Sequence, residues 1–307
     1  MNSNSNKSLY IKSCFYNNDL TFEGLILSTA TGFLVKYKEK VFLVTNRHVV
    51  TGKNLYTGEN LDKDNGALPN CIVVEFPYEV ETSDKGDTFW SNPFRLKLYK
   101  DDDFIDENRL WLEHPLYKEK VDVVAIDVTE IYNNSINILQ SLRNYKNVDI
   151  PLYENIGNIP CIPKVTDKVF VVGYPYGYST TVKRYLPIWS SANIASEYEE
   201  NLTMPINYTD KMHEIHNKIV SEEDSKKREE LNKELCKINN YEVPTFLIDS
   251  KTRGGQSGSP VLFESPIKSE KKEYHLIGIY SGRVNASSDL GYVWKIEVIK
   301  EILENGV

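Results

Sequence analysis

Short, apolar, β-prone runs separated by turns constrain the fold of this chain more than any other feature. They occupy residues 33–37, 41–45, 71–76, 94–98, 121–128, 168–173, 188–194, 245–248, 260–263, 275–281 and 292–294. Many short strands at modest spacing are typical of β-barrels and β-sandwiches. Residues 295–304 differ, because their isoleucine and leucine side chains recur at helical spacing and predict a C-terminal helix.

The pattern divides into two halves at an irregular stretch. Pro160 and Pro163 lie close together there, and closely spaced prolines are typical of a linker. We therefore expect a first β-barrel over residues 1–157 and a second over residues 158–307. Residues 197–242 interrupt the second half with charged, helix-prone sequence. They predict a helical insertion, in which Ser221 and Asp224 fit a capping box that restarts a helix.

Composition and charge exclude several classes of partner. The chain has 307 residues and a formal net charge of −8, and an acidic protein is repelled by nucleic acids and anionic membranes. No apolar run approaches the roughly 18 residues needed to cross a bilayer, and residues 1–12 lack the apolar core of a secretory signal. We therefore expect a cytoplasmic protein with neither partner, whose scattered cysteines (Cys14, Cys71, Cys161, Cys236) are reduced thiols.

A serine flanked by glycines precedes one of the predicted strands. Residues 254–260 read GGQSGSP, with Ser257 at the centre. Acyl transfer needs an exposed hydroxyl on a tight turn and backbone N–H groups that point at the developing oxyanion. Glycine permits the positive φ values that aim such groups. The alternative interpretation of this motif alone is an ordinary glycine-rich turn.

Two further residues complete a possible catalytic set. His48 follows the apolar run 41–45, and Asp122 lies at the start of the run 121–128. A buried carboxylate is costly unless it is hydrogen-bonded, and the Nδ1–H of a histidine is a suitable donor. Taken singly, His48 fits a structural histidine and Asp122 fits a residue that binds local backbone. Asp127, five residues further on, is the competing acid.

Together these motifs resemble those of the trypsin-like serine peptidases, and most closely the bacterial HtrA-like branch. The resemblance rests on LVTNRHVV at residues 43–50, DVVAIDV at 122–128, VVGYPYG at 171–177, FLIDSKTRGGQSGSP at 246–260 and LIGIYSG at 276–282. It implies an all-β fold of two six-stranded antiparallel barrels. Two departures are expected. The chain is expected to have no PDZ domain, and Ser259 lies at the position where the family usually has glycine.

The resemblance also implies a function. It makes the chain a serine endopeptidase that acts on proteins or peptides through His48, Asp122 and Ser257, with the N–H groups of Gly255 and Ser257 as oxyanion hole and no cofactor or metal. His213 and His216 have no third ligand nearby in the sequence. The alternatives are a catalytically silent scaffold and an esterase with the same triad.

Residues around Ser257 are also expected to bind substrate. By the same resemblance, the set is Lys251, Thr252, Tyr280, Ser281 and Gly282. A lysine at the base of the pocket would favour an acidic P1 side chain, whereas the alternative is a lysine that points to solvent. The helical insertion is expected to bind a regulatory protein or to form a simple lid.

Overall fold

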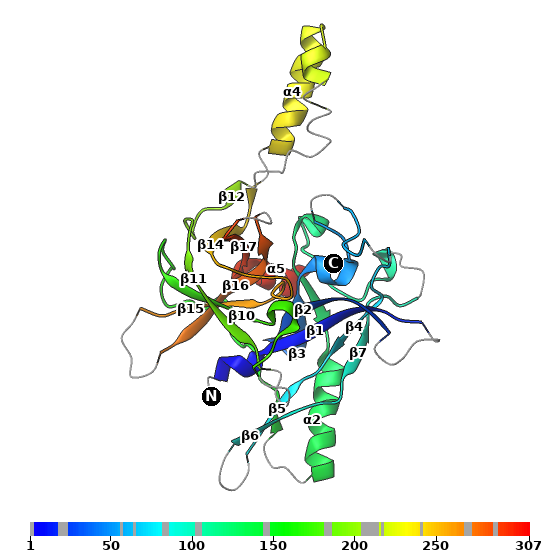
Figure 1. Ribbon diagram of the computed structural model, residues 1–307, viewed down its shortest axis with the longest axis vertical. Helices are drawn as coiled ribbons and strands as arrows, with labels where there is room; N and C mark the ends of the chain where they lie inside the picture. The colour runs from blue at the N-terminus through cyan, green and yellow to red at the C-terminus, as the bar shows by residue number, and fades with distance from the viewer. Residues whose placement is uncertain are drawn as a thin grey trace.

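The computed structural model describes residues 3–17, 24–55, 58–63, 66–81, 86–101, 106–143, 148–180, 186–203, 215, 218–239, 242–266, 272–284 and 288–307. Two six-stranded β units dominate it (Figure 1). In the first unit the strands follow the order β7-β4-β1-β2-β3-β8 and every neighbouring pair is antiparallel. Its strands are β1 (Ser8–Phe15), β2 (Leu25–Tyr37), β3 (Lys40–Thr45), β4 (Cys71–Val74), β7 (Phe94–Lys97) and β8 (Val124–Asp127).

The second unit is a closed antiparallel barrel with the order β10-β11-β14-β17-β16-β15. Closure satisfies the hydrogen-bonding groups of all six strands, so this unit has no free edge. Its strands are β10 (Lys168–Gly173), β11 (Ile188–Ile194), β14 (Thr245–Asp249), β15 (Pro260–Glu264), β16 (Tyr274–Arg283) and β17 (Leu290–Lys295).

The predicted fold class is confirmed, with one difference in the first unit. That unit is an open sheet, but a short segment bridges its two edge strands. The N–H of Leu110 donates to the carbonyl of Leu98, which follows β7, and Leu112 exchanges both backbone hydrogen bonds with Ala125 on β8. The segment therefore closes most of the gap. The division into domains at residues 157 and 158 stays a prediction.

The hydrophobic core crosses from one unit to the other. One buried cluster joins Phe33 and Val44 of the first unit to Val172 and Trp294 of the second. The C-terminal helix α5 (Ile296–Asn305) adds its buried side chains to the same cluster. It begins and ends one residue later than the expected helix, and its apolar stripe is the reason that it packs here.

Several elements were not predicted from the sequence. They are strand β1, the small sheet of β5 (Pro77–Glu81), β6 (Gly86–Trp90) and β9 (Val148–Asp149), and helices α1 (Arg47–Thr51) and α2 (Thr129–Arg143). Strand β1 contains polar residues such as Ser8 and Ser13, so its sequence does not show the apolar pattern of a strand. In the structure their hydroxyls donate hydrogen bonds to buried backbone carbonyls. Helix α2 packs Ile131, Ile136 and Leu139 against the first core.

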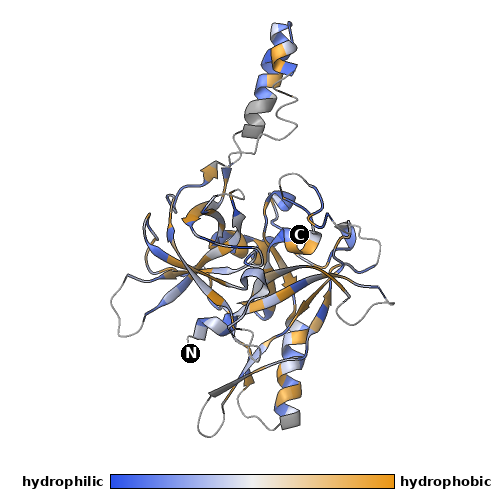
Figure 2. Cartoon of the chain, in the orientation of Figure 1, coloured by the Kyte–Doolittle hydropathy of each residue, from blue (hydrophilic) through white to orange (hydrophobic). Residues whose placement is uncertain are grey.

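The insertion forms a helix that projects from the barrels. Helix α4 (Ser225–Asn239) extends away from both β units in Figure 1 and is largely hydrophilic in Figure 2. Asp224 caps it, because its carboxylate accepts the N–H of Lys226 at 2.9 Å. This is a correction, since the sequence predicted that Ser221 would be the cap. At its base β12 (Leu202–Thr203) pairs with β13 (Glu242–Val243).

Within the described part of the chain, no helix combines the length and apolarity that crossing a membrane requires. Cys14, Cys71 and Cys161 are not paired in disulfides.

Candidate active site

The partly buried His48 and the buried Asp122 form a pair at the end of the first sheet. The distance from Nδ1 of His48 to Oδ2 of Asp122 is 2.7 Å, and the backbone N–H of His48 donates to Oδ1 at 2.9 Å. His48 lies in the first turn of α1, where helix N–H groups have no partner within the helix. One carboxylate therefore fixes both the ring and the backbone of His48.

The backbone around Asp122 leaves the β ladder to make these contacts. Strand β8 begins at Val124, two residues after Asp122 and three residues later than the predicted run. The side chain of Asn46 donates to the carbonyl of Asp122 at 2.6 Å. The hydroxyl of Ser281 also donates to Oδ2 of Asp122. Asn46 was missed from the sequence, because its only signal is its place two residues before His48.

The environment of His48 shifts its titration. Burial of the ring lowers the pKa of His48, but the negative charge of Asp122 and its hydrogen bond raise the pKa by more, so the net shift is upward from 6.5. The Asp122 side chain is 1% exposed, so little water screens the pair. Because Nδ1 faces the carboxylate, we assign the proton of the neutral ring to Nδ1, which leaves Nε2 as an acceptor.

The loop that carries Ser257 depends on two glycines with positive φ. Gly255 has φ +89° and Gly258 has φ +83°. A Cβ atom at Gly255 would lie 2.3 Å from the carbonyl oxygen of Tyr174, and one at Gly258 would lie 2.0 Å from that of Thr31. Any side chain at either position would therefore clash as well as strain the backbone.

Ser281 links Ser257 to Asp122. The hydroxyl of Ser257 donates to the carbonyl of Ser281 at 3.0 Å, while the hydroxyl of Ser281 reaches Asp122. Strand β16 shifts its register against β17 between Tyr280 and Gly282, so Ser281 is the extra residue of a β-bulge. Bulges redirect a residue away from the ladder and are frequent beside active sites. The sequence predicted Ser281 only as part of a substrate-binding wall.

The peptide groups that carry the Gly255 and Ser257 N–H groups are held at their carbonyl ends. The carbonyl of Gly254 accepts the N–H of Tyr176 at 2.6 Å, and that of Gln256 accepts the N–H of Ser259 at 3.0 Å. In a planar trans peptide the N–H points opposite to the C=O. Fixing these two carbonyls therefore fixes the directions of the two predicted oxyanion donors.

The residue before Ser257 is held by neutral partners. The side-chain oxygen of Gln256 accepts the N–H of Arg253 at 2.8 Å, and its side-chain nitrogen donates to the hydroxyl of Ser190 at 2.9 Å. Gln256 is 1% exposed, so both ends of its amide are satisfied inside the protein. The loop needs no charged group at this position.

The predicted substrate-binding residues occupy different environments. The Lys251 side chain is exposed at the surface, whereas Thr252 is buried and its hydroxyl is hydrogen-bonded to that of Tyr280. Burial raises the pKa of Tyr280 to about 12, with the Thr252 hydrogen bond and Arg283 opposing it. A Cβ at Gly282 would meet open space. Roles for these residues in binding stay predictions.

The other acid and the other histidines lie elsewhere. Asp127 forms an ion pair with Lys40 at 2.9 Å and is 41% exposed. The buried His114 contacts Glu301 at 2.6 Å. His213 and His216 lie outside the described residues. Across the described part of the chain, no group of three acidic, histidine or cysteine side chains gathers in a way that could hold a metal ion.

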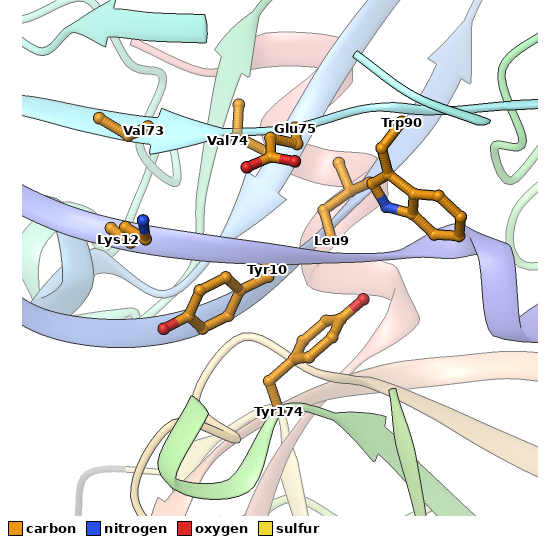
Figure 3. Close-up of a pocket in the computed structure, with 8 residues that line it drawn as sticks. All are labelled: Leu9, Tyr10, Lys12, Val73, Val74, Glu75, Trp90 and Tyr174. Atoms are coloured by element: carbon orange, nitrogen blue, oxygen red, sulfur yellow. The ribbon is translucent and has the colours of Figure 1, made fainter. Parts of the chain in front are cut away.

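A small pocket lies beside Tyr174, at the start of the 174–177 turn that contacts the Ser257 loop. Figure 3 shows Tyr10 and Tyr174 side by side at this pocket, which Leu9, Lys12, Val73, Val74, Glu75 and Trp90 also line. The two tyrosine rings are 5.3 Å apart, and the Tyr174 hydroxyl donates to the carbonyl of Ser8 at 3.0 Å. The pocket contains none of the predicted site residues, but Tyr174 anchors the turn from that side.

Comparisons with known proteins return solved structures of low sequence identity. No family model matches the chain, and no curated protein does so. One similar structure is the active form of the Rv3671c protease from M. tuberculosis, with 15% identity, a TM-score of 0.45 and coverage of 98% of this chain and 81% of that one. Another is the serine endoprotease from Yersinia pestis, with 12% identity, a TM-score of 0.43 and coverage of 98% and 62%.

Proposed function

We propose that this chain is a serine endopeptidase in which His48, Asp122 and Ser257 form the catalytic triad. One observation carries the proposal. Asp122 binds Nδ1 of His48 and, through Ser281, is linked to the hydroxyl of Ser257. Nucleophilic acyl transfer requires an acid that orients a histidine and a serine hydroxyl that the histidine can deprotonate, and the link through Ser281 supports this arrangement.

In the proposed reaction, the Ser257 hydroxyl leaves the Ser281 carbonyl and donates to Nε2 of His48. Nε2 takes the proton as Oγ attacks the carbonyl carbon of the scissile peptide bond. Asp122 stabilises the imidazolium ion, and the N–H groups of Gly255 and Ser257 bind the oxyanion. His48 then protonates the leaving amine. Water, activated by His48, attacks the acyl-enzyme ester, and the proton returns to Ser257 Oγ.

The proposal extends to the setting of the reaction. With a domain division at residues 157 and 158, His48 and Asp122 belong to the first domain and Ser257 to the second, and a junction between domains is a common place for a substrate cleft. The substrates are proteins or peptides, with Lys251, Thr252, Tyr280, Ser281 and Gly282 near the bound chain. The proposed setting is the cytoplasm, which fits four widely scattered cysteines kept as reduced thiols.

The test compares substitutions in the proposed triad. Ser257→Ala is expected to lower kcat on a cleavable peptide by about 10⁴–10⁶, since triad members act as a unit. Asp122→Asn is expected to lower it by roughly 10⁴, because the histidine would adopt the wrong tautomer. Asp127→Asn is the matched control, since Asp127 binds Lys40 at the surface. Near-normal turnover by purified Ser257→Ala, or loss of turnover only in Asp127→Asn, would contradict the proposal.

Two measurements separate the alternatives. A fluorophosphonate probe should label the wild-type chain but not Ser257→Ala, and a folded wild type that resists the probe would instead indicate a silent scaffold. Peptide-library cleavage profiling then separates a peptidase from an esterase. Ester hydrolysis without any peptide cleavage would support the esterase.

A further inference from the structure

Four consecutive carbonyl groups of the Ser257 loop each accept a hydrogen bond. Those of Gly254 and Gln256 accept the N–H groups of Tyr176 and Ser259, as described above. Those of Gly255 and Ser257 are both held by Thr31, which lies on β2 of the first unit. Thr31 thus reaches across from one β unit to the loop of the other.

Thr31 uses its backbone and its side chain for these contacts. Its N–H donates to the Ser257 carbonyl at 2.8 Å, and its hydroxyl donates to the Gly255 carbonyl at 2.8 Å. The same hydroxyl accepts the N–H of Tyr174 at 3.1 Å. Thr31 is fully buried. Its single donor hydrogen and an acceptor lone pair are therefore both used, and they tie the 174–177 turn to the Ser257 loop.

We propose that Thr31 is a positioning residue for the oxyanion hole, an inference that rests on the proposed function. Gly255 lies between two peptide groups. The peptide group before Gly255 contains the Gly255 N–H, and its carbonyl accepts a hydrogen bond from Tyr176. The peptide group after Gly255 contains the Gly255 carbonyl, which accepts a hydrogen bond from the Thr31 hydroxyl. With both groups anchored, Gly255 is kept at φ +89°. The Gly255 N–H then points toward the space where the oxyanion develops.

The hydroxyl matters because glycine does not hold this conformation by itself. Glycine occupies positive and negative φ regions about equally well. Without the Thr31 hydroxyl, the peptide between Gly255 and Gln256 keeps only its longer contact, from the Gln256 N–H to the Arg253 carbonyl at 3.3 Å. That peptide is then held less firmly. The Tyr174 N–H also loses its partner, in the same turn whose Tyr176 N–H holds the Gly254 carbonyl, so the direction of the Gly255 N–H is less firmly fixed. Misdirected donors stabilise the transition state less without changing how the ground-state substrate binds.

The experiment compares three substitutions in the full-length chain. Thr31→Val keeps the shape of the side chain and removes the hydroxyl, whereas Thr31→Ser keeps the hydroxyl. We expect Thr31→Val to lower kcat by about 10–10³-fold with KM within about threefold, since loss of one oxyanion donor costs up to about 10³ in kcat. Thr31→Ser should restore most of the rate. Ser135→Ala controls for loss of a buried hydroxyl, since Ser135 donates to the Ile131 carbonyl at 2.7 Å on α2, and its kcat should match wild type.

A second pair of readouts separates positioning from general damage. The acidic limb of the pH–rate profile should keep its midpoint in Thr31→Val, because the His48–Asp122 pair is untouched. A peptide boronate, which mimics the tetrahedral intermediate, should bind Thr31→Val more weakly by about the factor lost in kcat. If Thr31→Val does not fold, Thr31→Ala takes its place in the comparison with Thr31→Ser, because it adds no atoms.

The outcomes distinguish this inference from the proposed function. A wild-type chain that neither cleaves peptides nor reacts with a fluorophosphonate would contradict the proposed function. An active wild type with an equally active Thr31→Val would overturn only the role of Thr31. A Thr31→Ser variant as impaired as Thr31→Val would also overturn it, because the hydroxyl would then not be the group that acts.

Discussion

At the scale of single residues, the titration of His48 decides the pH dependence of the proposed reaction. Burial lowers its pKa, yet the charge and hydrogen bond of Asp122 raise the pKa by more, to above 6.5. His48 accepts a proton only when neutral, so kcat/KM should rise with pH through a midpoint above 6.5. By linkage, the upward shift stabilises the folded chain fully below 6.5, and that contribution is lost as pH rises through the folded-state pKa.

Asp122→Asn tests whether Asp122 is the group that raises the pKa of His48. The substitution removes both contributions that raise the pKa of His48 and leaves burial, so the midpoint of the residual activity should move to lower pH than in wild type. The measurement is a pH–rate profile of kcat/KM for wild type, Asp122→Asn and Asp127→Asn. Asp127→Asn should keep the wild-type midpoint. An unchanged or higher midpoint in Asp122→Asn would contradict the assignment.

At the scale of elements, the inserted helix is separable from the barrels that it leaves. The base of the insertion is anchored where β12 pairs with β13 and where Nζ of the buried Lys295 donates to the Glu200 carbonyl at 2.8 Å. From Ser225 to Glu230 the side chains of α4 are exposed. A helix with so little buried surface contributes little to the stability of the rest.

Replacing residues 218–239 by a short Gly/Ser linker should therefore leave the Tm within about 3 °C of wild type, because none of the described side chains of this segment, residues 218–233, is buried. Differential scanning calorimetry measures this. If the insertion binds a regulatory protein, one of the two roles expected from the sequence, specificity or oligomeric state should change while the Tm does not. A large fall in Tm would show that the insertion covers the barrel. Unchanged activity, specificity and oligomeric state would refute a regulatory role.

At the scale of the whole molecule, α5 helps to join the two β units. Its buried Ile299 belongs to the cluster that contains Phe33 of the first unit and Trp294 of the second. Ile299→Ala should lower the free energy of unfolding by about 2–5 kcal/mol, the usual cost of an isoleucine-to-alanine cavity. Because the cluster is shared, we expect both units to unfold in one transition.

Urea unfolding followed by tryptophan fluorescence and by circular dichroism measures both expectations. Glu304→Ala, at an exposed position of the same helix, should change the free energy of unfolding by less than about 0.5 kcal/mol. Two separate transitions in wild type would contradict the idea of a shared core. An equal loss of unfolding free energy in Ile299→Ala and Glu304→Ala would contradict the view that burial of Ile299 stabilises the protein.

The sequence by itself determined the fold class and the residues proposed for chemistry. Apolar runs with β propensity specify strands locally, and a serine among glycines can be recognised along the chain without knowing what surrounds it. The sequence did not identify β1 or α2, whose polar positions become favourable only against a core that other segments supply.

The tertiary structure alone decided how these residues are held. Thr31 and Gly255 are 224 residues apart, and Ser281 and Asp122 are 159 apart. Neither contact leaves a pattern in the local sequence, because a threonine on an apolar strand and a serine before a glycine are common. Their roles depend on the docking of one β unit against the other and on a bulge in β16, and both arise only when strands distant in sequence pair and close.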